Sequence, residues 1–142
     1  YRVPGGAKTP VLLQRTPYNK ASGQTTAEGY AKEGYTVVVQ DCRGRDASAG
    51  AFVPYNNEGQ DGYDTLDWIK AQTWSEGRVG MWGASYVGAA QWQAAAEDGP
   101  GLTVLAPTAT WTSFYRNIYV GGVSRLALIS QAATLCSGRR KV

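Results

Sequence analysis

The sequence contains no histidine, and this absence limits the chemistry that its 142 residues can perform alone. Histidine is the common general base for a nucleophilic serine, and with cysteine it supplies most protein zinc sites. The two cysteines, Cys42 and Cys136, lack the C-x-x-C spacing of a metal or redox motif, so we expect free thiols. The sequence therefore excludes a self-sufficient Ser-His-Asp triad and a Cys/His zinc site, and it predicts no metal and no cofactor.

Long apolar runs and a broad excess of charge are also missing. No uninterrupted apolar stretch approaches membrane-spanning length, and residues 1–4 do not have the pattern of a signal peptide. The net charge of +3 belongs to Arg139, Arg140 and Lys141, because without them the basic and acidic residues balance. Such a short terminal cluster is more often a solvated end than a nucleic-acid patch. We therefore expect no nucleic-acid partner and no membrane partner, and we slightly favour a cytoplasmic location.

The residues that are present describe a globular α/β domain. Hydrophobic residues make up 43% of the chain and charged residues only 18%. Apolar, β-prone runs predict four strands, at 10–15, 35–40, 78–82 and 102–107. Helical patterns separate them, at about 25–33, 58–71 and 86–97. This alternation predicts a mainly parallel sheet with helices on both faces.

The first two predicted helices begin with the spacing of a capping box, in which two side chains satisfy each other's backbone N–H groups. Thr25 is followed by Glu28, and Asn57 by Gln60. Gly34 supplies a left-handed stop to the first helix. We expect these residues to set the helix boundaries.

Residues 83–88, Gly-Ala-Ser-Tyr-Val-Gly, lie between the third predicted strand and an alanine-rich helix. A sharp strand-to-helix turn that exposes a serine needs small flanking residues, and Gly83 and Gly88 supply them. The amide of Tyr86 lies at a helix N-terminus, where free N–H groups and the helix dipole favour a developing oxyanion. We expect Ser85 to be a nucleophile and the Tyr86 N–H an oxyanion donor. The alternative is an ordinary turn in which Ser85 caps the helix.

Four motifs occur in order along the chain: Arg-Thr-Pro-Tyr at 15–18, Asp-Cys-Arg-Gly-Arg at 41–45, Gly-Tyr-Asp-Thr-Leu-Asp-Trp at 62–68, and Gly-Arg-Val-Gly-Met-Trp-Gly-Ala-Ser-Tyr at 77–86. Together they resemble the family of cocaine esterases and X-prolyl dipeptidyl-peptidases, which also includes α-amino-acid ester hydrolases. The resemblance implies a partial α/β-hydrolase fold. Its core would span 1–110, the start of a helical cap 111–136, and a basic tail, which we expect to be disordered, 137–142.

The resemblance also implies an activity. Members of this family are serine hydrolases of the acyl esterase or dipeptidyl-peptidase type, which implies a small-molecule ester or peptide substrate and an acyl-enzyme at Ser85. It further implies that the hydroxyl of Tyr18 joins the Tyr86 N–H in the oxyanion hole. The family's catalytic Asp and His lie beyond the matching segment, so we expect this chain to carry the nucleophile half only and to have little activity alone. A catalytically inactive α/β-hydrolase-like binding module is the alternative.

Several charged residues near these motifs have simpler interpretations than catalysis. Asp41 follows a predicted strand, where a triad acid would be sought, but the resemblance places Asp41 and Arg43 in a loop motif that acts as an ion pair or a loop clamp. Neither Lys20 nor Lys70 has a spacing that brings it to Ser85 as a substitute base. Nothing in this chain is therefore assigned as the acid or the base.

The remaining candidates are structural. Asp61, Asp64 and Asp67 recur at three-residue spacing, and solvent-facing or capping carboxylates explain this more simply than a metal site. We expect Trp82 and Trp92 to pack around the serine turn. The resemblance implies that Phe114, Tyr115 and Tyr119 begin the family's helical cap, which helps to shape the acyl pocket. Because a partial sheet leaves edges uncovered, we also expect self-association.

Overall fold

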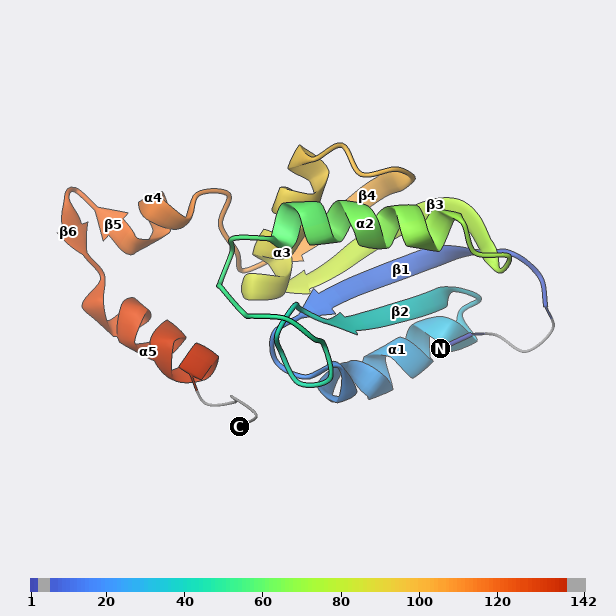
Figure 1. The fold of residues 1–142 in the computed structure, drawn as a ribbon, viewed down its shortest axis with the longest axis horizontal. Coiled ribbons are helices and arrows are strands. Elements are labelled where there is room, and N and C mark those ends of the chain that lie inside the picture. Colours follow the sequence, from blue (N-terminus) through green and yellow to red (C-terminus); the bar gives the residue numbers. More distant parts are fainter. Residues whose placement is uncertain (3–5, 138–142) are drawn as a thin grey trace.

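A four-stranded sheet forms the centre of the computed structural model, which describes residues 1–2 and 6–137 (Figure 1). Its strands are β1 (Thr9–Thr16), β2 (Thr36–Asp41), β3 (Ser75–Ala84) and β4 (Leu102–Thr108). They pair in the order β2-β1-β3-β4, and all three pairings are parallel. The four predicted strands and the parallel sheet are therefore confirmed. The predicted tail at 137–142 lies outside the described residues except for Ser137.

Three helices connect these strands and lie on both faces of the sheet, as predicted. A short 3-10 turn, η1 (Lys20–Gly23), precedes α1 (Gln24–Lys32), and α2 (Glu58–Lys70) and α3 (Tyr86–Ala96) follow β2 and β3. The chain moves outward from β1 to β2 and then crosses back over β1 to β3. Because both crossovers are right-handed, this reversal puts α1 on the face opposite to α2 and α3. Accordingly, α1 contacts β2, whereas α2 and α3 contact each other and β3.

The core lies between the sheet and the pair α2 and α3. Alternate residues of β1 and β3 point toward these helices, as the two-residue period of a strand requires. Fully or almost fully buried side chains make up this core: Val11, Leu13, Leu66, Ile69, Val79, Met81 and Ala94. Beside this core, Arg15 near the carboxyl end of β1 contacts Glu58 in the first turn of α2, which matters for the site described below.

Both predicted capping boxes are wrong. The N-cap of α1 is Gly23, because η1 continues directly into the helix, and the side chain of Asn19 caps η1 by accepting from the Ala21 N–H at 2.9 Å. Asn57 is the N-cap of α2, but its side chain makes no capping hydrogen bond. Gly34 does adopt the predicted left-handed conformation, with φ of 97°.

The chain after β4 leaves the sheet and forms a separate group of small elements, drawn in orange and red in Figure 1. These are α4 (Phe114–Ile118), the two-stranded hairpin β5 (Tyr119–Val120) and β6 (Val123–Ser124), and α5 (Leu126–Ser137). Within the described ranges, no helix is long and apolar enough to cross a membrane. The division of the chain into core and cap stays a prediction.

The two edges of the sheet differ. On the outer edge of β2, Tyr1 and Val37 exchange two backbone hydrogen bonds of 2.9 and 2.8 Å, so this end of the edge is paired. The opposite edge is β4, where the side chain of Val104 is 58% exposed. An apolar side chain so exposed on an edge strand is an open surface for association.

Candidate active site

Ser85 lies in the turn between β3 and α3, with φ of 58° and ψ of −124°. This is a strained conformation for a residue with a side chain, and such strain is frequent at catalytic turns. The flanking glycines are required by space. A Cβ at Gly83 would lie 2.4 Å from Cγ1 of Val87, and one at Gly88 would lie 2.7 Å from Cβ of Thr110. A residue larger than glycine at position 83 or 88 would therefore require Val87 or Thr110 to move.

The backbone of Ser85 is held while its hydroxyl is not. Its N–H donates to the Thr108 carbonyl at 3.0 Å, and its carbonyl accepts from the Thr110 hydroxyl at 2.8 Å. Ser85 is the N-cap residue of α3, but its side chain makes no capping hydrogen bond. The alternative in which Ser85 serves only as a helix cap is therefore wrong. Within the described part of the chain, the Ser85 hydroxyl has no hydrogen-bond partner.

The strand order brings Tyr18 and Ser85 to the same end of the sheet, where the carboxyl ends of β1 and β3 lie side by side. β1 and β3 are neighbours, but the chain leaves β1 toward β2 and leaves β3 toward β4, in opposite directions. In α/β sheets a crevice opens at such a switch point, beyond the carboxyl ends of the strands, and ligands bind there. Tyr18 follows β1 and Ser85 ends β3, so the two residues flank this switch point. The Tyr18 ring lies edge-on to that of Tyr86, with centroids 6.5 Å apart.

Tyr86 follows Ser85 directly and is the first residue of α3, so its N–H has no acceptor within the helix. Its side chain is buried. The hydroxyl donates to Oε1 of Glu58 at 2.8 Å and accepts from the Tyr55 N–H at 3.0 Å. Burial, and then the negative charge of Glu58, raise the pKa of the Tyr86 hydroxyl above its usual range. The hydroxyl is therefore held in its neutral, hydrogen-bonding form.

Beneath this turn lies a buried ion pair that the sequence reasoning missed. Nη1 of Arg15 is 2.9 Å from Oε2 of Glu58, and the two side chains are only 1% and 4% exposed. The same nitrogen donates to the Glu58 carbonyl at 2.7 Å, and Nε donates to Oε1 of Gln40 at 2.9 Å. A signal for this pair exists, because Val11, Leu13 and Arg15 alternate along one strand face. A charged residue at the third such position requires a buried partner.

Asp41 is a loop clamp and does not pair with Arg43. Its carboxylate accepts from the backbone N–H groups of Lys20 at 2.7 Å and Ala47 at 3.3 Å, and it forms an ion pair with Nζ of Lys20 at 3.4 Å. Arg43 instead pairs with Asp61, donating from Nε at 3.1 Å. Of the two roles expected for Asp41 and Arg43, the loop clamp is confirmed for Asp41 and the mutual ion pair is wrong. Lys20 is engaged with Asp41, away from any role at Ser85.

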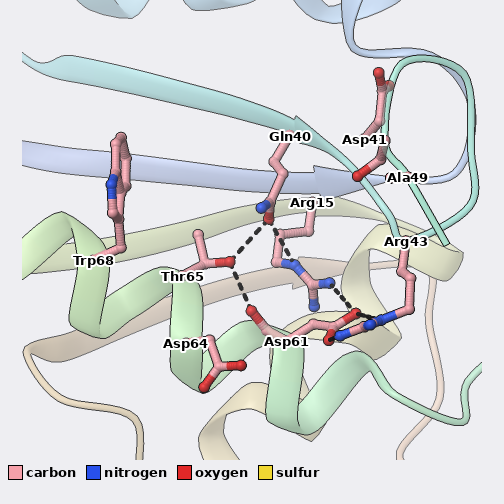
Figure 2. A pocket seen from close by; sticks show the side chains of 10 residues that line it. Arg15, Gln40, Asp41, Arg43, Ala49, Asp61, Asp64, Thr65 and Trp68 are labelled. Carbon is pink, nitrogen blue, oxygen red and sulfur yellow. Dashed lines mark hydrogen bonds and ion pairs between the residues drawn. The ribbon is translucent and has the colours of Figure 1, made fainter.

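Asp61 also differs from its predicted solvent-facing role. Figure 2 shows it between Arg15 and Arg43, whose guanidinium groups both turn toward its carboxylate. Thr65, one turn further along α2, has its hydroxyl oxygen 3.0 Å from Oε1 of Gln40 and 2.6 Å from the Asp61 carbonyl, and its single hydrogen can be donated to either acceptor. These residues line an open polar cavity in which the charges are paired. Ser85 and Tyr18 do not line it, so it is not the candidate active site.

Aromatic side chains gather beside the serine turn around a residue that the sequence reasoning overlooked, Tyr55. Its ring stacks on that of Tyr86 with centroids 4.2 Å apart, and it contacts the rings of Phe114 at 4.7 Å and Trp111 at 5.9 Å. Phe114, the first residue of α4, thus contacts the aromatic group beside the turn, while its predicted role in an acyl pocket stays a prediction. No sequence pattern marks Tyr55, because it lies in an irregular loop and has a positive φ of 62°.

Trp82 lies away from the serine turn, whereas the predicted cap role of Tyr115 and Tyr119 stays a prediction. Trp82 packs against Tyr30 of α1, with ring centroids 5.5 Å apart, on the face of the sheet opposite to α3. The prediction that Trp82 packs around the serine turn is therefore wrong. Tyr115 and Tyr119 stack on each other at 4.9 Å.

No group of three or more His, Cys, Asp or Glu side chains within residues 1–2 and 6–137 could hold a metal ion. Cys42, the cysteine whose side chain is described, is free and buried. Burial, and then the charge of Glu58, raise the pKa of its thiol. The arrangement thus offers a half-buried serine hydroxyl with no hydrogen-bond partner among the described residues, next to the N–H of Tyr86.

A parallel sheet with a strained serine between a strand and a helix at its switch point defines the α/β-hydrolase class of fold. Residues 2–141 match the family model described as X-Pro dipeptidyl-peptidase (S15 family), and the chain belongs to this family. It is 40% identical over 147 aligned residues to cocaine esterase from Rhodococcus sp. (strain MB1 Bresler). That alignment covers 97% of this chain and 26% of cocaine esterase.

Solved structures agree with this assignment. A CocE/NonD family hydrolase from Staphylococcus aureus superposes with a TM-score of 0.87 at 24% identity, over 98% of this chain and 30% of that chain. An α-amino acid ester hydrolase superposes with a TM-score of 0.78 at 26% identity, over 96% of this chain and 26% of that chain. The chain therefore spans between a quarter and a third of the length of these relatives. Its family membership supports a hydrolase function.

Proposed function

We propose that this chain carries the nucleophile half of a serine hydrolase of the acyl esterase or dipeptidyl-peptidase type, acting on a small-molecule ester or peptide. The observation that carries the proposal is Ser85 itself. Its backbone is strained and fixed at the carboxyl end of β3, while its hydroxyl has no partner among the described residues. The similarity to cocaine esterase and to an α-amino acid ester hydrolase supports an acyl substrate.

In the proposed reaction, Oγ of Ser85 attacks the carbonyl carbon of the substrate and its proton passes to a general base. The carbonyl oxygen becomes an oxyanion, which accepts hydrogen bonds from the Tyr86 N–H and the Tyr18 hydroxyl. Collapse of this intermediate breaks the bond to the leaving alcohol or amine, which takes the proton from the base. Water then attacks the acyl-enzyme by the same route, releasing the acid and restoring Ser85.

The base must come from elsewhere, because the chain has no histidine. Lys20 is tied to Asp41 and does not serve. We propose that the base and its orienting acid are supplied by residues outside 1–142. In serine proteases, loss of the triad lowers turnover by about 10⁶-fold, or about 8 kcal/mol of barrier. Residues 1–142 alone should therefore hydrolyse esters extremely slowly.

The absence of histidine also favours a second candidate, an inactive module that binds a ligand through the same crevice. The two candidates differ when a histidine-bearing segment is supplied. A hydrolase half should regain turnover on complementation by the corresponding region of a relative. A binding module should bind its ligand equally well with or without that segment and should never turn it over.

A fluorophosphonate probe tests the nucleophile directly. We expect the complemented protein to form one phosphonyl adduct, which intact mass and peptide mapping place at Ser85. The variant Ser85→Ala should form none, while its circular dichroism spectrum stays unchanged. A folded, complemented sample that is not labelled, or labelling that survives Ser85→Ala, would contradict the proposed function.

A further inference from the structure

A buried chain of contacts links Arg15 to the residue that follows the proposed nucleophile. Arg15 contacts Glu58, and Glu58 accepts the hydrogen bond of the Tyr86 hydroxyl. We propose that Glu58, anchored by Arg15, is a positioning residue that fixes Tyr86, and through the Tyr86 ring also Tyr18, so that the oxyanion hole is formed before substrate binds. This inference rests on the proposed function of Ser85 and assigns a role to residues that do not touch the substrate.

The side chain of Tyr86 is held by contacts to its hydroxyl and its ring. Its hydroxyl is used twice, donating to Glu58 at 2.8 Å and accepting from the Tyr55 N–H at 3.0 Å. Its ring stacks on Tyr55 and contacts Phe52, with centroids 6.0 Å apart. A side chain held at its tip and along its faces cannot rotate without breaking these contacts. Because the Tyr86 amide is on the same residue, its direction beside Ser85 is set by the buried side chain.

Glu58, the first residue of α2, carries a buried carboxylate. A carboxylate buried to this degree is stable only with a paired charge and further hydrogen bonds. Arg15 supplies the charge, at 2.9 Å from Oε2, and also binds the Glu58 carbonyl. The positive end of the α2 dipole favours the same negative charge. Glu58 is therefore a fixed acceptor rather than a mobile side chain, and it ties the start of α2 to both β1 and α3.

The loop that carries Tyr18 is connected to the same buried residues. Arg15 and Tyr18 belong to one short motif, so the anchor of Glu58 and the proposed side-chain donor move together. Between them, the Pro17 carbonyl accepts from Nε of the buried Arg45 at 2.9 Å, which holds this loop from the β2 side. The edge of the Tyr18 ring then rests on Tyr86. The two residues that carry the proposed oxyanion donors therefore contact each other through their rings, and Tyr86 is bound to the buried Glu58.

A positioning role for the Arg15–Glu58 pair predicts a change in kcat that a purely structural role does not. A structural pair would lower stability but leave turnover per folded molecule unchanged. A positioning pair lowers kcat in molecules that remain folded, with little change in KM, because the oxyanion exists only in the transition state. Misplacement of a reacting group by about 1 Å can cost about 100-fold in rate.

The experiment uses the complemented protein of the fluorophosphonate test, assayed with an aryl ester well below the melting temperature of each variant. Tyr86→Phe keeps the ring and removes only the hydroxyl. Glu58→Gln keeps an acceptor for Tyr86 but removes the charge that Arg15 pairs. Tyr63→Phe is the matched control, because Tyr63 lies on the exposed side of α2. We expect kcat to fall about 10- to 100-fold in the first two variants, with KM within about two-fold, and to stay unchanged in the control.

Ser85→Ala, assayed in the same way, distinguishes a failure of the positioning role from a failure of the proposed function. If Ser85→Ala abolishes turnover while folded Tyr86→Phe and Glu58→Gln keep the kcat of Tyr63→Phe, the positioning role is overturned and the proposed function stands. If Ser85→Ala retains turnover, or the parent chain is neither active nor labelled by fluorophosphonate, both are overturned. If Glu58→Gln does not fold, Tyr86→Phe decides the question, since it leaves the ion pair intact.

Discussion

The buried ion pair of Arg15 and Glu58 gives the sharpest test of how this fold is held together. Arg15→Met removes the guanidinium and leaves the Glu58 carboxylate, only 4% exposed, without its counter-charge. Breaking a buried pair in this way typically costs about 3–5 kcal/mol, because the desolvated charge stays behind. Arg15 also binds the Glu58 carbonyl and Gln40, so we expect the upper part of that range.

The double variant Arg15→Met/Glu58→Leu removes both charges and fills similar volume with apolar atoms. Such replacements are often neutral or stabilising, although here Tyr86 and Gln40 each lose a hydrogen-bond partner, at about 1–3 kcal/mol per unsatisfied group. We therefore expect the double variant to be more stable than Arg15→Met alone. Urea unfolding followed by tryptophan fluorescence measures each free energy of unfolding.

Arg78→Met is the matched control for this cycle. Arg78 pairs with Glu76 at 2.7 Å, but the two side chains are 67% and 33% exposed. An exposed pair contributes only about 0–1 kcal/mol. If Arg15→Met costs no more than Arg78→Met, or if the double variant is as unstable as the sum of its single changes, the buried pair does not act as described.

Three further outcomes are expected. Gly83→Ala should lower the free energy of unfolding by about 1–3 kcal/mol in the same urea assay, because its Cβ would meet Val87 at 2.4 Å, whereas Gly29→Ala, with open space around it in α1, should not. Burial raises the pKa of the Cys42 thiol, so the native state keeps a proton that the unfolded chain loses above about pH 8.5. The free energy of unfolding should therefore fall as the pH rises, by up to about 1.4 kcal/mol per pH unit. Cys42→Ala should remove this slope from urea melts recorded at different pH values. The exposed β4 edge should make the isolated chain self-associate, which a monodisperse monomer in light scattering would contradict, and Val104→Lys on that edge should reduce the association.

The sheet was predictable because each strand contains a short apolar, β-prone stretch, and such a stretch favours a strand even where the strand is partly exposed, as in β4. The helix boundaries were less predictable from the sequence. Thr25 has the spacing of a capping residue, yet the chain is already helical there because η1 leads straight into α1. Asn57 does precede α2, but it makes no capping bond, and Glu58 in the next position turns inward to Arg15. A local pattern of caps cannot account for a long-range ion pair that competes for the same residues.

The candidate site was predictable where one segment contains all that is needed. The glycines around Ser85 and the following helix are adjacent in sequence, so a short stretch of residues is enough to recognise the turn. The partners of Arg15, Asp41 and Asp61 are set by strand order and by the path of the loops, neither of which is encoded in a short window. Asp41 therefore clamps Lys20 and Ala47 rather than pairing with its sequence neighbour Arg43.

The four sequence motifs acquire a common explanation from these contacts. Arg15, in the first motif, holds Glu58 and Asp61 at the start of α2, the helix that carries the third motif. Arg45, in the second motif, binds the Pro17 carbonyl of the first. Tyr86, in the fourth motif, binds Glu58. The first and second motifs therefore contact each other directly, and the first and fourth both contact Glu58 at the start of α2, so these contacts hold the loops after β1, β2 and β3 in one arrangement. The proposed nucleophile and oxyanion donors lie on two loops, after β1 and after β3, and such a site needs contacts between loops because a parallel sheet fixes where its loops begin but not where they end.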